Sequence, residues 1–274
     1  MTVKKVRLDV LMVERELIET REKAKRAIMA GMVFSNTERL DKPGMKVSED
    51  IDLSIKGRMM PYVGRGGYKL EKAIDVFDIA MEGQTLLDIG SSTGGFTDCA
   101  LQNGAKLSYA LDVGYNQLAW KLRNDPRVKV MERTNFRHAT PELFDRGQPS
   151  IASIDVSFIS LKLILPVLST ILEPKGDVIA LIKPQFEAGR DQVGKKGIVR
   201  DSAIHIDVIE RIVDFAQREH FHIKGLTHSP ITGGDGNIEF LAHFIYDENK
   251  RSTVDHKEIE NVVRLAHKEL NAST

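Results

Sequence analysis

Leu86-Leu87-Asp88-Ile89-Gly90-Ser91-Ser92-Thr93-Gly94-Gly95-Phe96-Thr97-Asp98 is the stretch that decides the fold of this 274-residue chain. Its apolar start predicts a short buried strand, and the small residues that follow predict a tight turn that opens a helix. Glycine suits such a turn because it tolerates positive φ and lets a ligand approach the backbone closely. We therefore predict a strand, a ligand-binding turn and a helix.

A second acid follows one strand later. The predicted strand 107–113 ends in Leu111-Asp112-Val113-Gly114, where the Asp112 carboxylate can accept hydrogen bonds from both hydroxyls of a ribose. A nucleoside-bearing cofactor is implied. The turn lacks the Lys-Ser/Thr pair of a phosphate loop and the G-x-G-x-x-G spacing of a dinucleotide site. The alternative is a glycine-rich turn that binds no ligand.

Asp88 narrows the choice of cofactor, because a carboxylate before the turn would repel a pyrophosphate. It suits the cationic methionine end of S-adenosylmethionine, which we predict as the cofactor. The predicted cofactor-binding residues are Asp88, Gly90, Ser91, Ser92, Thr93, Gly94, Gly95, Phe96, Asp112 and Val113.

The composition limits the class of protein and the compartment to be expected. The chain is 42% hydrophobic and 28% charged, as in an ordinary soluble globular protein. It has neither an apolar run long enough to span a membrane nor an apolar secretory segment near its start. The single cysteine, Cys99, cannot form an internal disulfide, so a cytoplasmic location is expected, with no membrane partner and no metal site.

The first 58 residues predict a small α+β module. Apolar spacing indicates helices over residues 6–17 and from Thr20 to about residue 30, with Gly31 ending the second. Short strands are expected at residues 32–34 and 51–55. Basic residues gather on the second helix, although a solvated charged face is an alternative reading.

This module resembles the alpha-L RNA-binding domain of a ribosomal small-subunit protein and of many RNA-modifying enzymes. The motifs that carry the resemblance are Arg7-Leu8-Asp9, Thr20-Arg21-Glu22-Lys23-Ala24 and Ala30-Gly31-Met32-Val33. We expect RNA contacts from Arg7, Arg21, Lys23, Lys25, Arg26 and Arg65.

The rest of the chain alternates strands and helices, and we place a linker at 59–64 before a second domain at 65–274. Seven predicted strands with mostly helical connections indicate a doubly wound α/β sheet. The strands are expected at 85–89, 107–113, 127–131, 150–156, 177–183, 221–228 and 239–246. The last two are joined by a glycine-rich loop and should pair antiparallel. This arrangement resembles the Rossmann-like class I S-adenosylmethionine-dependent methyltransferase fold.

Four charged residues should converge near the cofactor, because ligands bind beyond the carboxyl ends of strands in open α/β sheets. Asp155 and Lys183 end two predicted strands, Glu239 opens the antiparallel strand, and Lys69 follows the turn Gly64-Arg65-Gly66-Gly67-Tyr68. Singly, each could be a surface charge or a helix cap. A lysine that closes the apolar run 178–182 is the least ordinary, because burial without a partner is costly.

Taken together, the motifs resemble the TlyA (haemolysin A) family of FtsJ-like rRNA methyltransferases over nearly the whole chain. The matching stretches include Gly-Arg-Gly-Gly-Tyr-Lys, Asp-Val-Ser-Phe-Ile-Ser, Ile-Lys-Pro-Gln-Phe-Glu and Gly-Asn-Ile-Glu-Phe. The resemblance implies a catalytic Lys-Asp-Lys-Glu tetrad at Lys69, Asp155, Lys183 and Glu239. It also implies methyl transfer from S-adenosylmethionine to the ribose 2′-oxygen of cytidine, with ribosomal RNA or ribosomal subunits as partner. The alternatives are a non-catalytic RNA-binding protein and a membrane-active haemolysin.

Overall fold

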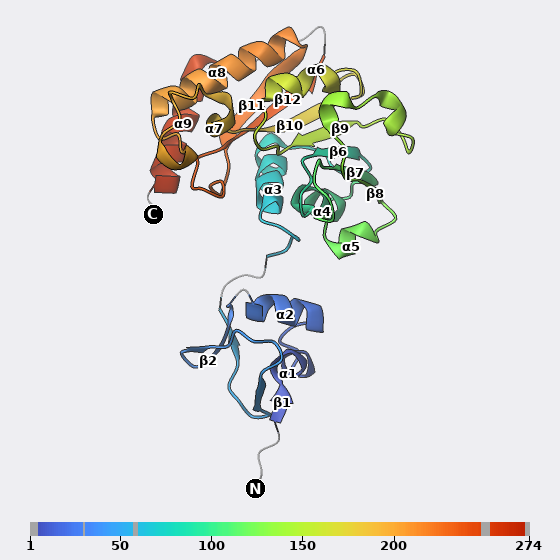
Figure 1. Cartoon of the computed structure of the whole chain (residues 1–274), viewed down its shortest axis with the longest axis vertical. Helices are drawn as coiled ribbons and strands as arrows, with labels where there is room; N and C mark the ends of the chain where they lie inside the picture. Colours follow the sequence, from blue (N-terminus) through green and yellow to red (C-terminus); the bar gives the residue numbers. More distant parts are fainter. Residues whose placement is uncertain (1–4, 30, 57–59, 248–252, 272–274) are drawn as a thin grey trace. The chain divides into compact units, whose positions relative to one another are not determined.

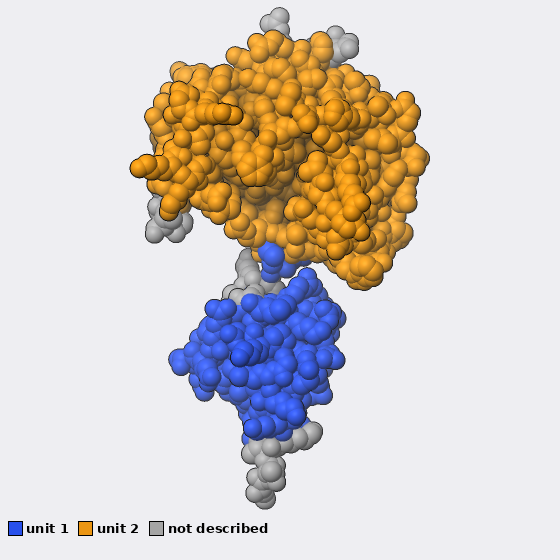
Figure 2. All heavy atoms as spheres, viewed as in Figure 1, with its two compact units in different colours: residues 1–61 blue, residues 62–274 orange. Residues whose placement is uncertain are grey.

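The computed structural model describes residues 5–29, 31–56, 60–247 and 253–271, and the following account is confined to these. The chain divides into two compact units, residues 1–61 and 62–274 (Figure 2). The start of the predicted linker, at residue 59, lies outside the described residues. Each unit is considered by itself.

The second unit is built on a seven-stranded sheet with the order β11-β12-β10-β9-β6-β7-β8. Its strands are β6 (Thr85–Ile89), β7 (Leu107–Leu111), β8 (Val128–Met131), β9 (Ile151–Ile154), β10 (Asp177–Ile182), β11 (Phe221–His228) and β12 (Phe240–Tyr246). Only β12 runs against its neighbours, pairing antiparallel with both β10 and β11. The predicted mostly parallel sheet and its antiparallel ending are confirmed, and the strands are one or two residues shorter at several ends.

Helices cover both faces of this sheet (Figure 1). The helices are α3 (Gly66–Phe77), α4 (Gly95–Gln102), α5 (Trp120–Arg123), α6 (Leu165–Leu168), α7 (Pro184–Glu187), α8 (Ser202–Arg218) and α9 (His256–Asn271). Short 3₁₀ turns lie at Phe136–His138, Pro141–Leu143, Leu161–Leu163 and Lys195–Gly197. One apolar core joins the sheet to α6, α8 and α9, and a second core joins the opposite face to α3 and α4. The sheet is therefore buried on both sides, as parallel sheets normally are.

Residues 161–172, an apolar stretch between β9 and β10, do not form one continuous helix. It forms a 3₁₀ turn followed by the four-residue α6, with Pro166 in the first turn of α6. Proline removes a backbone donor and clashes with the preceding turn, so a continuous helix through this point is disfavoured. Leu161, Leu165 and Leu168 are still fully buried against the sheet.

The first unit contains two short helices and five very short strands. These are β1 (Lys5–Arg7), α1 (Leu8–Glu14), α2 (Arg21–Met29), β2 (Val33–Ser35), β3 (Glu38–Arg39), β4 (Lys46–Ser48) and β5 (Ser54–Ile55). Strand β1 pairs with β4, while β2 lies between β3 and β5. The predicted helices are present, although the first is shorter than the expected 6–17, and β1, β3 and β4 were not predicted, because two or three residues are too few to give a periodic pattern.

Asp9 is the charged centre of the first unit. Its carboxylate is fully buried and accepts hydrogen bonds from Arg7 Nε at 2.9 Å and from Arg21 Nη2 at 2.9 Å. Hydrogen bonds from Arg7 foremost, and then from Arg21, lower the pKa of Asp9 to about 2 although burial opposes them. Both guanidiniums remain about half exposed, so this carboxylate fixes two cations at the surface of the unit.

We expect Asp9→Asn to destabilise the first unit by roughly 1–3 kcal/mol at pH 6, the usual range for hydrogen bonds to charged groups. Because the folded pKa lies below the ordinary value of 3.8, the carboxylate stabilises the unit above about pH 4, and this stabilisation is lost as pH falls toward 2. Amide hydrogen exchange of α1 and α2 in the intact chain measures both effects. Equal protection of wild type and variant at pH 6 would contradict the expectation.

Candidate active site

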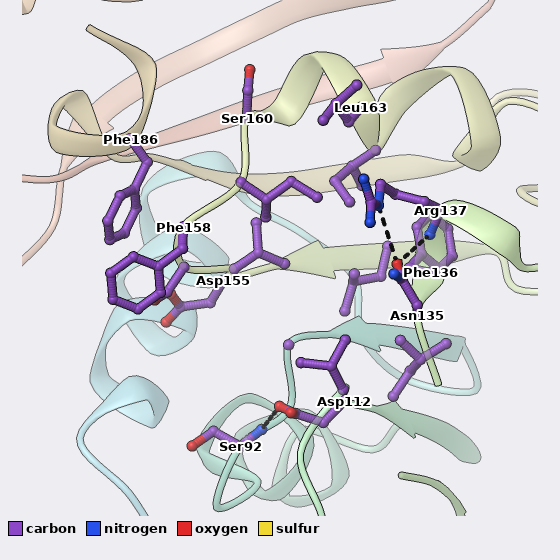
Figure 3. Close-up of a pocket in the computed structure, with 18 of the residues that line it drawn as sticks. Ser92, Asp112, Asn135, Phe136, Arg137, Asp155, Phe158, Ser160, Leu163 and Phe186 are labelled. Carbon is purple, nitrogen blue, oxygen red and sulfur yellow. Dashed lines mark hydrogen bonds between the residues drawn. The ribbon is translucent and has the colours of Figure 1, made fainter. Parts of the chain in front are cut away.

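A cavity of about 720 Å³ lies at the carboxyl ends of the parallel strands (Figure 3). Its lining comes from the segments that follow β6, β7, β8, β9 and β10. Of the residues predicted to bind the cofactor, Gly90, Ser92, Asp112 and Val113 line this cavity. This is the edge at which ligands bind in open α/β sheets.

Gly90 makes the sharp turn after β6. Its φ is +86°, and a Cβ atom placed there would lie 2.5 Å from the backbone oxygen of Asp155. The amides of Gly90 and Ser91 both donate to the carbonyl of Leu111, at 2.9 and 3.0 Å. Only glycine fits this position, because any side chain would collide with the neighbouring strand end.

Asp112 is held by backbone amides on both sides. Its Oδ2 accepts from Ser92 N at 2.7 Å (Figure 3). Its Oδ1 accepts from Gly114 N at 2.7 Å. An ionised carboxylate has about four lone-pair positions, so each oxygen can accept one further hydrogen bond. The carboxylate is thus oriented before any ligand arrives.

Asp88 differs from its predicted role of facing the cofactor. It is fully buried and lies outside the cavity lining. Its oxygens accept from the amide and hydroxyl of Thr97 at 3.1 and 2.7 Å and from the hydroxyl of Ser153 at 3.1 Å. Burial raises the pKa of Asp88 to about 6, against the opposing hydrogen bonds. Asp88 therefore fastens the start of α4 beneath the turn.

The other turn residues also lie outside the cavity lining. Ser91, Thr93, Gly94, Gly95 and Phe96 form the back of the turn and the first residues of α4. Residues 62–67 pack against this back: a Cβ atom on Gly95 would lie 2.8 Å from Gly67 N and 3.1 Å from Gly64 O. Part of the predicted linker is therefore a packed element of the second unit.

Two residues anchor that packed segment. Tyr62 is buried and donates its hydroxyl to Glu71 at 2.7 Å, and Val63 N donates to Asp98 Oδ2 at 2.9 Å. Asp98 Oδ1 accepts from Lys121 at 2.8 Å. Asp98 thus connects the segment to α4 and α5.

The four predicted catalytic residues form one chain of alternating charges. Lys183 Nζ lies 2.5 Å from Asp155 Oδ1, and Lys69 Nζ lies 3.2 Å from Asp155 Oδ2. Lys69 Nζ also donates to Glu239 Oε2 at 2.8 Å. No more than 18% of any of these side chains is exposed. Two positive and two negative groups balance, so no buried charge among them lacks a partner.

The two lysines differ in their surroundings. Burial, the largest influence, lowers the pKa of Lys69, but the charges of Asp155 and Glu239 outweigh it and the pKa is raised above its usual value. Lys69 is therefore an ammonium at neutral pH. Lys183 has one carboxylate partner and the hydroxyl of Ser157 at 3.4 Å. Burial raises the pKa of Asp155, but Lys69 and Lys183 together lower it, so this carboxylate stays ionised.

Several cavity residues were not predicted. Asn135, Phe136 and Arg137 follow β8 and form one end of the cavity, while Phe158 and Phe186 stand beside Asp155 at the other (Figure 3). Phe158 is 90% exposed at φ +63°, and its ring centroid lies 4.9 Å from that of Phe186. Residues 135–137 could have been predicted from the sequence, because they follow β8 and ligands bind beyond the carboxyl ends of such strands. The sequence carries no comparable signal for the ring pair.

The predicted RNA-binding residues are mostly engaged in ion pairs. Besides Arg7 and Arg21 with Asp9, Lys23 pairs with Glu19 and Lys25 pairs with Glu22. Exposed pairs of this kind contribute little free energy, so their cations remain available to a polyanion. Arg26 and Arg65 are exposed, the latter immediately before α3. None of the described helices is long and apolar enough to cross a membrane.

Comparisons with known proteins agree with this geometry. The chain is 63% identical over 272 residues to "Putative rRNA methyltransferase YqxC" of Bacillus subtilis, covering 98% of this chain and 97% of that protein. It is 41% identical to "16S/23S rRNA (cytidine-2'-O)-methyltransferase TlyA" of Mycobacterium tuberculosis, covering 87% and 89%. The solved structure "Putative hemolysin from Streptococcus thermophilus" is 55% identical, with a TM-score of 0.79 and 99% of each chain covered.

Family models match both units. The S4 domain model matches residues 6–50, and the FtsJ-like methyltransferase model matches residues 62–246. These matches confirm the resemblance seen in the sequence motifs. The chain therefore belongs to the FtsJ-like methyltransferase family and carries an N-terminal S4 domain.

Proposed function

We propose that this protein is a cytoplasmic enzyme that methylates the 2′-oxygen of cytidine ribose in ribosomal RNA. The observation that carries the proposal is the charge chain Lys183–Asp155–Lys69–Glu239 beside the cavity. The rRNA and 2′-oxygen specificity rests on similarity to the relative from Mycobacterium tuberculosis, which is named for that activity. A non-catalytic RNA-binding protein would have no use for two buried lysines held by two buried carboxylates.

S-adenosylmethionine is the methyl donor of this family and, when bound, supplies an electrophilic methyl group on a sulfonium. The cavity fits a nucleoside, because the oriented Asp112 carboxylate can accept from ribose hydroxyls and residues 135–137 can surround the base. Gly90 leaves the turn free of a side chain where the ligand passes. Asp88 holds this turn from below and does not contact the ligand.

The tetrad divides its work between two lysines. Lys69, held by two carboxylates, stays protonated and fixes Asp155 in place. Asp155 in turn directs Lys183 Nζ. We assign to Lys183 the contact with the ribose hydroxyl: in its neutral form it accepts the hydroxyl proton, and as an ammonium it stabilises the developing oxyanion. Alignment of the oxygen with the methyl group contributes further to the rate.

The S4 unit supports an RNA substrate through Arg7 and Arg21, which Asp9 holds at its surface, and through the basic residues of α2. Arg65 lies at the start of α3, four residues before Lys69. We assign these residues to contacts with RNA phosphates. The substrate is ribosomal RNA, free or within a ribosomal subunit.

Replacing Asp112 with alanine should weaken S-adenosylmethionine binding by about 1–3 kcal/mol, or roughly 5- to 150-fold, because charged hydrogen bonds are lost. Isothermal titration calorimetry measures this directly. Thermal unfolding followed by circular dichroism reports whether the variant is folded. Unchanged affinity in a folded variant would show that Asp112 does not contribute to cofactor binding.

Replacing Lys183 with alanine should preserve folding and cofactor affinity but slow methyl transfer by about 10²-fold or more, the scale of general acid–base catalysis. Lys183→Arg tests which role applies, because a guanidinium keeps the charge but does not act as a base at neutral pH. Single-turnover transfer of a labelled methyl group to ribosomal RNA is the measurement. Recovery of most of the activity by arginine would restrict Lys183 to electrostatic stabilisation.

The double variant Lys25→Gln, Arg26→Gln should weaken RNA binding and reduce its log–log salt slope by roughly 0.7–0.9 per lost phosphate contact. Arg21 is left in place because it holds Asp9. Lys42→Gln, Lys46→Gln removes the same charge elsewhere in the unit and serves as the control. A salt slope equal to that of wild type would favour a merely solvated α2 face.

A further inference from the structure

A basic turn lies at the same edge of the sheet as the tetrad but outside it. Residues 194–200 carry Lys195, Lys196 and Arg200 and no acid. This segment follows β10, at whose end Lys183 stands, and it precedes α8. The loop that leads to Glu239 and β12 contacts it directly.

Hydrogen bonds fix the backbone of this turn. Gly194 N donates to Ile198 O at 3.1 Å, which closes the turn. The side chain of Asn237, 2% exposed, accepts from Val199 N at 3.0 Å and donates to Gly197 O at 2.9 Å. His205 Nε2 lies 3.2 Å from Val199 O. The turn therefore presents its side chains from a fixed position.

Asn237 also sets the distance to the tetrad. It stands two residues before Glu239, so at most about 7 Å of chain separates their Cα atoms. The backbone that Asn237 holds is thus connected to Glu239, one end of the tetrad, through a single buried side chain and two residues of chain. We expect an RNA strand whose ribose reaches Lys183 to continue across this part of the surface.

The three cations are free to meet an anion. Lys195, Lys196 and Arg200 are exposed, and the structure records no ion pair for them among the described residues. They line a hollow of about 460 Å³. Asp201 also lines this hollow, and its carboxylate caps α8 by accepting from Ala203 N at 2.9 Å, so three cations face one acid there.

Lys196 occupies an unusual backbone position. Its φ and ψ are 67° and 19°, and Gly197 follows at φ +72°, so two successive residues are left-handed. Glycine, asparagine and aspartate are favoured in such a turn, and another side chain there carries a conformational cost. The same left-handed φ occurs at Lys175, so the conformation fixes where Lys196 stands and does not by itself indicate a ligand.

We propose that the basic turn, residues 194–200, binds phosphates of the substrate RNA strand next to the target nucleotide. This inference rests on the proposed function and adds to it the surface along which the strand reaches the tetrad. Lys195, Lys196 and Arg200 contact successive phosphates, while Asn237 keeps their backbone at a fixed distance from Glu239.

The test is the triple variant Lys195→Gln, Lys196→Gln, Arg200→Gln in the full chain. Methyl transfer is measured on ribosomal RNA and on ribosomal subunits from a strain lacking this enzyme, at several salt concentrations. We expect KM for RNA to rise roughly 10- to 100-fold and the log–log salt slope of kcat/KM to fall by about 2, at about 0.7 per single-strand contact. The kcat at saturating RNA and the affinity for S-adenosylmethionine should stay near wild type.

The matched control is Lys106→Gln, Arg146→Gln, Lys175→Gln, which removes the same charge from exposed positions before β7, β9 and β10, at the opposite edge of the sheet. It should leave KM unchanged. Lys196→Gly is a second variant: it relieves the left-handed backbone, so a structural role predicts equal or greater stability with unchanged KM. Our proposal predicts a raised KM in spite of that stability.

Three results would overturn the proposal while leaving the enzyme's function intact. They are an unchanged KM and salt slope in the triple variant, an equal loss in the control, and a defect with subunits that is absent with protein-free RNA. The last result would indicate that the three cations contact a ribosomal protein and not RNA. If wild-type enzyme transfers no methyl group to either substrate, the proposed function itself fails.

Discussion

The contact of the partly buried Asp155 carboxylate with the Nζ atoms of both Lys69 and Lys183 is the interaction on which the site depends. A buried lysine is costly unless a partner neutralises it, and here one carboxylate serves two lysines while Glu239 supplies the second negative charge. Loss of any member would leave an uncompensated charge. The four residues therefore act as a unit, although they come from α3, the ends of β9 and β10, and the start of β12.

The same residue joins the tetrad to the cofactor cavity. The backbone oxygen of Asp155 lies against Gly90, where no side chain fits, and its carboxylate lines the cavity. Asp88 and Ser153 hold the neighbouring strands β6 and β9 together beneath this point. The positions of the Gly90 turn and of Lys183 are thus set by three adjacent strand ends, those of β6, β9 and β10.

Outside the tetrad, side chains that are not charged set the positions of charged ones. Asn237 fixes the basic turn relative to Glu239, and the packed segment 62–67 supports the turn that begins at Gly90. In the S4 unit the relation is reversed, because the buried acid Asp9 positions the exposed Arg7 and Arg21. In the S4 unit this contact orders two long, flexible cations, and such ordering lowers the entropy cost of binding an anion.

The sequence by itself predicted the seven strands of the large sheet, its antiparallel ending and the four charged residues near its edge, because apolar periodicity and strand-end position are local signals. The prediction that Asp88 faces the cofactor does not match its position, because a carboxylate before a glycine turn gives the same sequence pattern whether it faces a ligand or bonds the start of the following helix. The sequence also missed Phe158, Phe186 and the hold of Asn237 on residues 197 and 199, which depend on loops far apart in the chain. Only the tertiary structure decided which lysine has two carboxylate partners, because ion pairing depends on distances between separate elements and not on residue order.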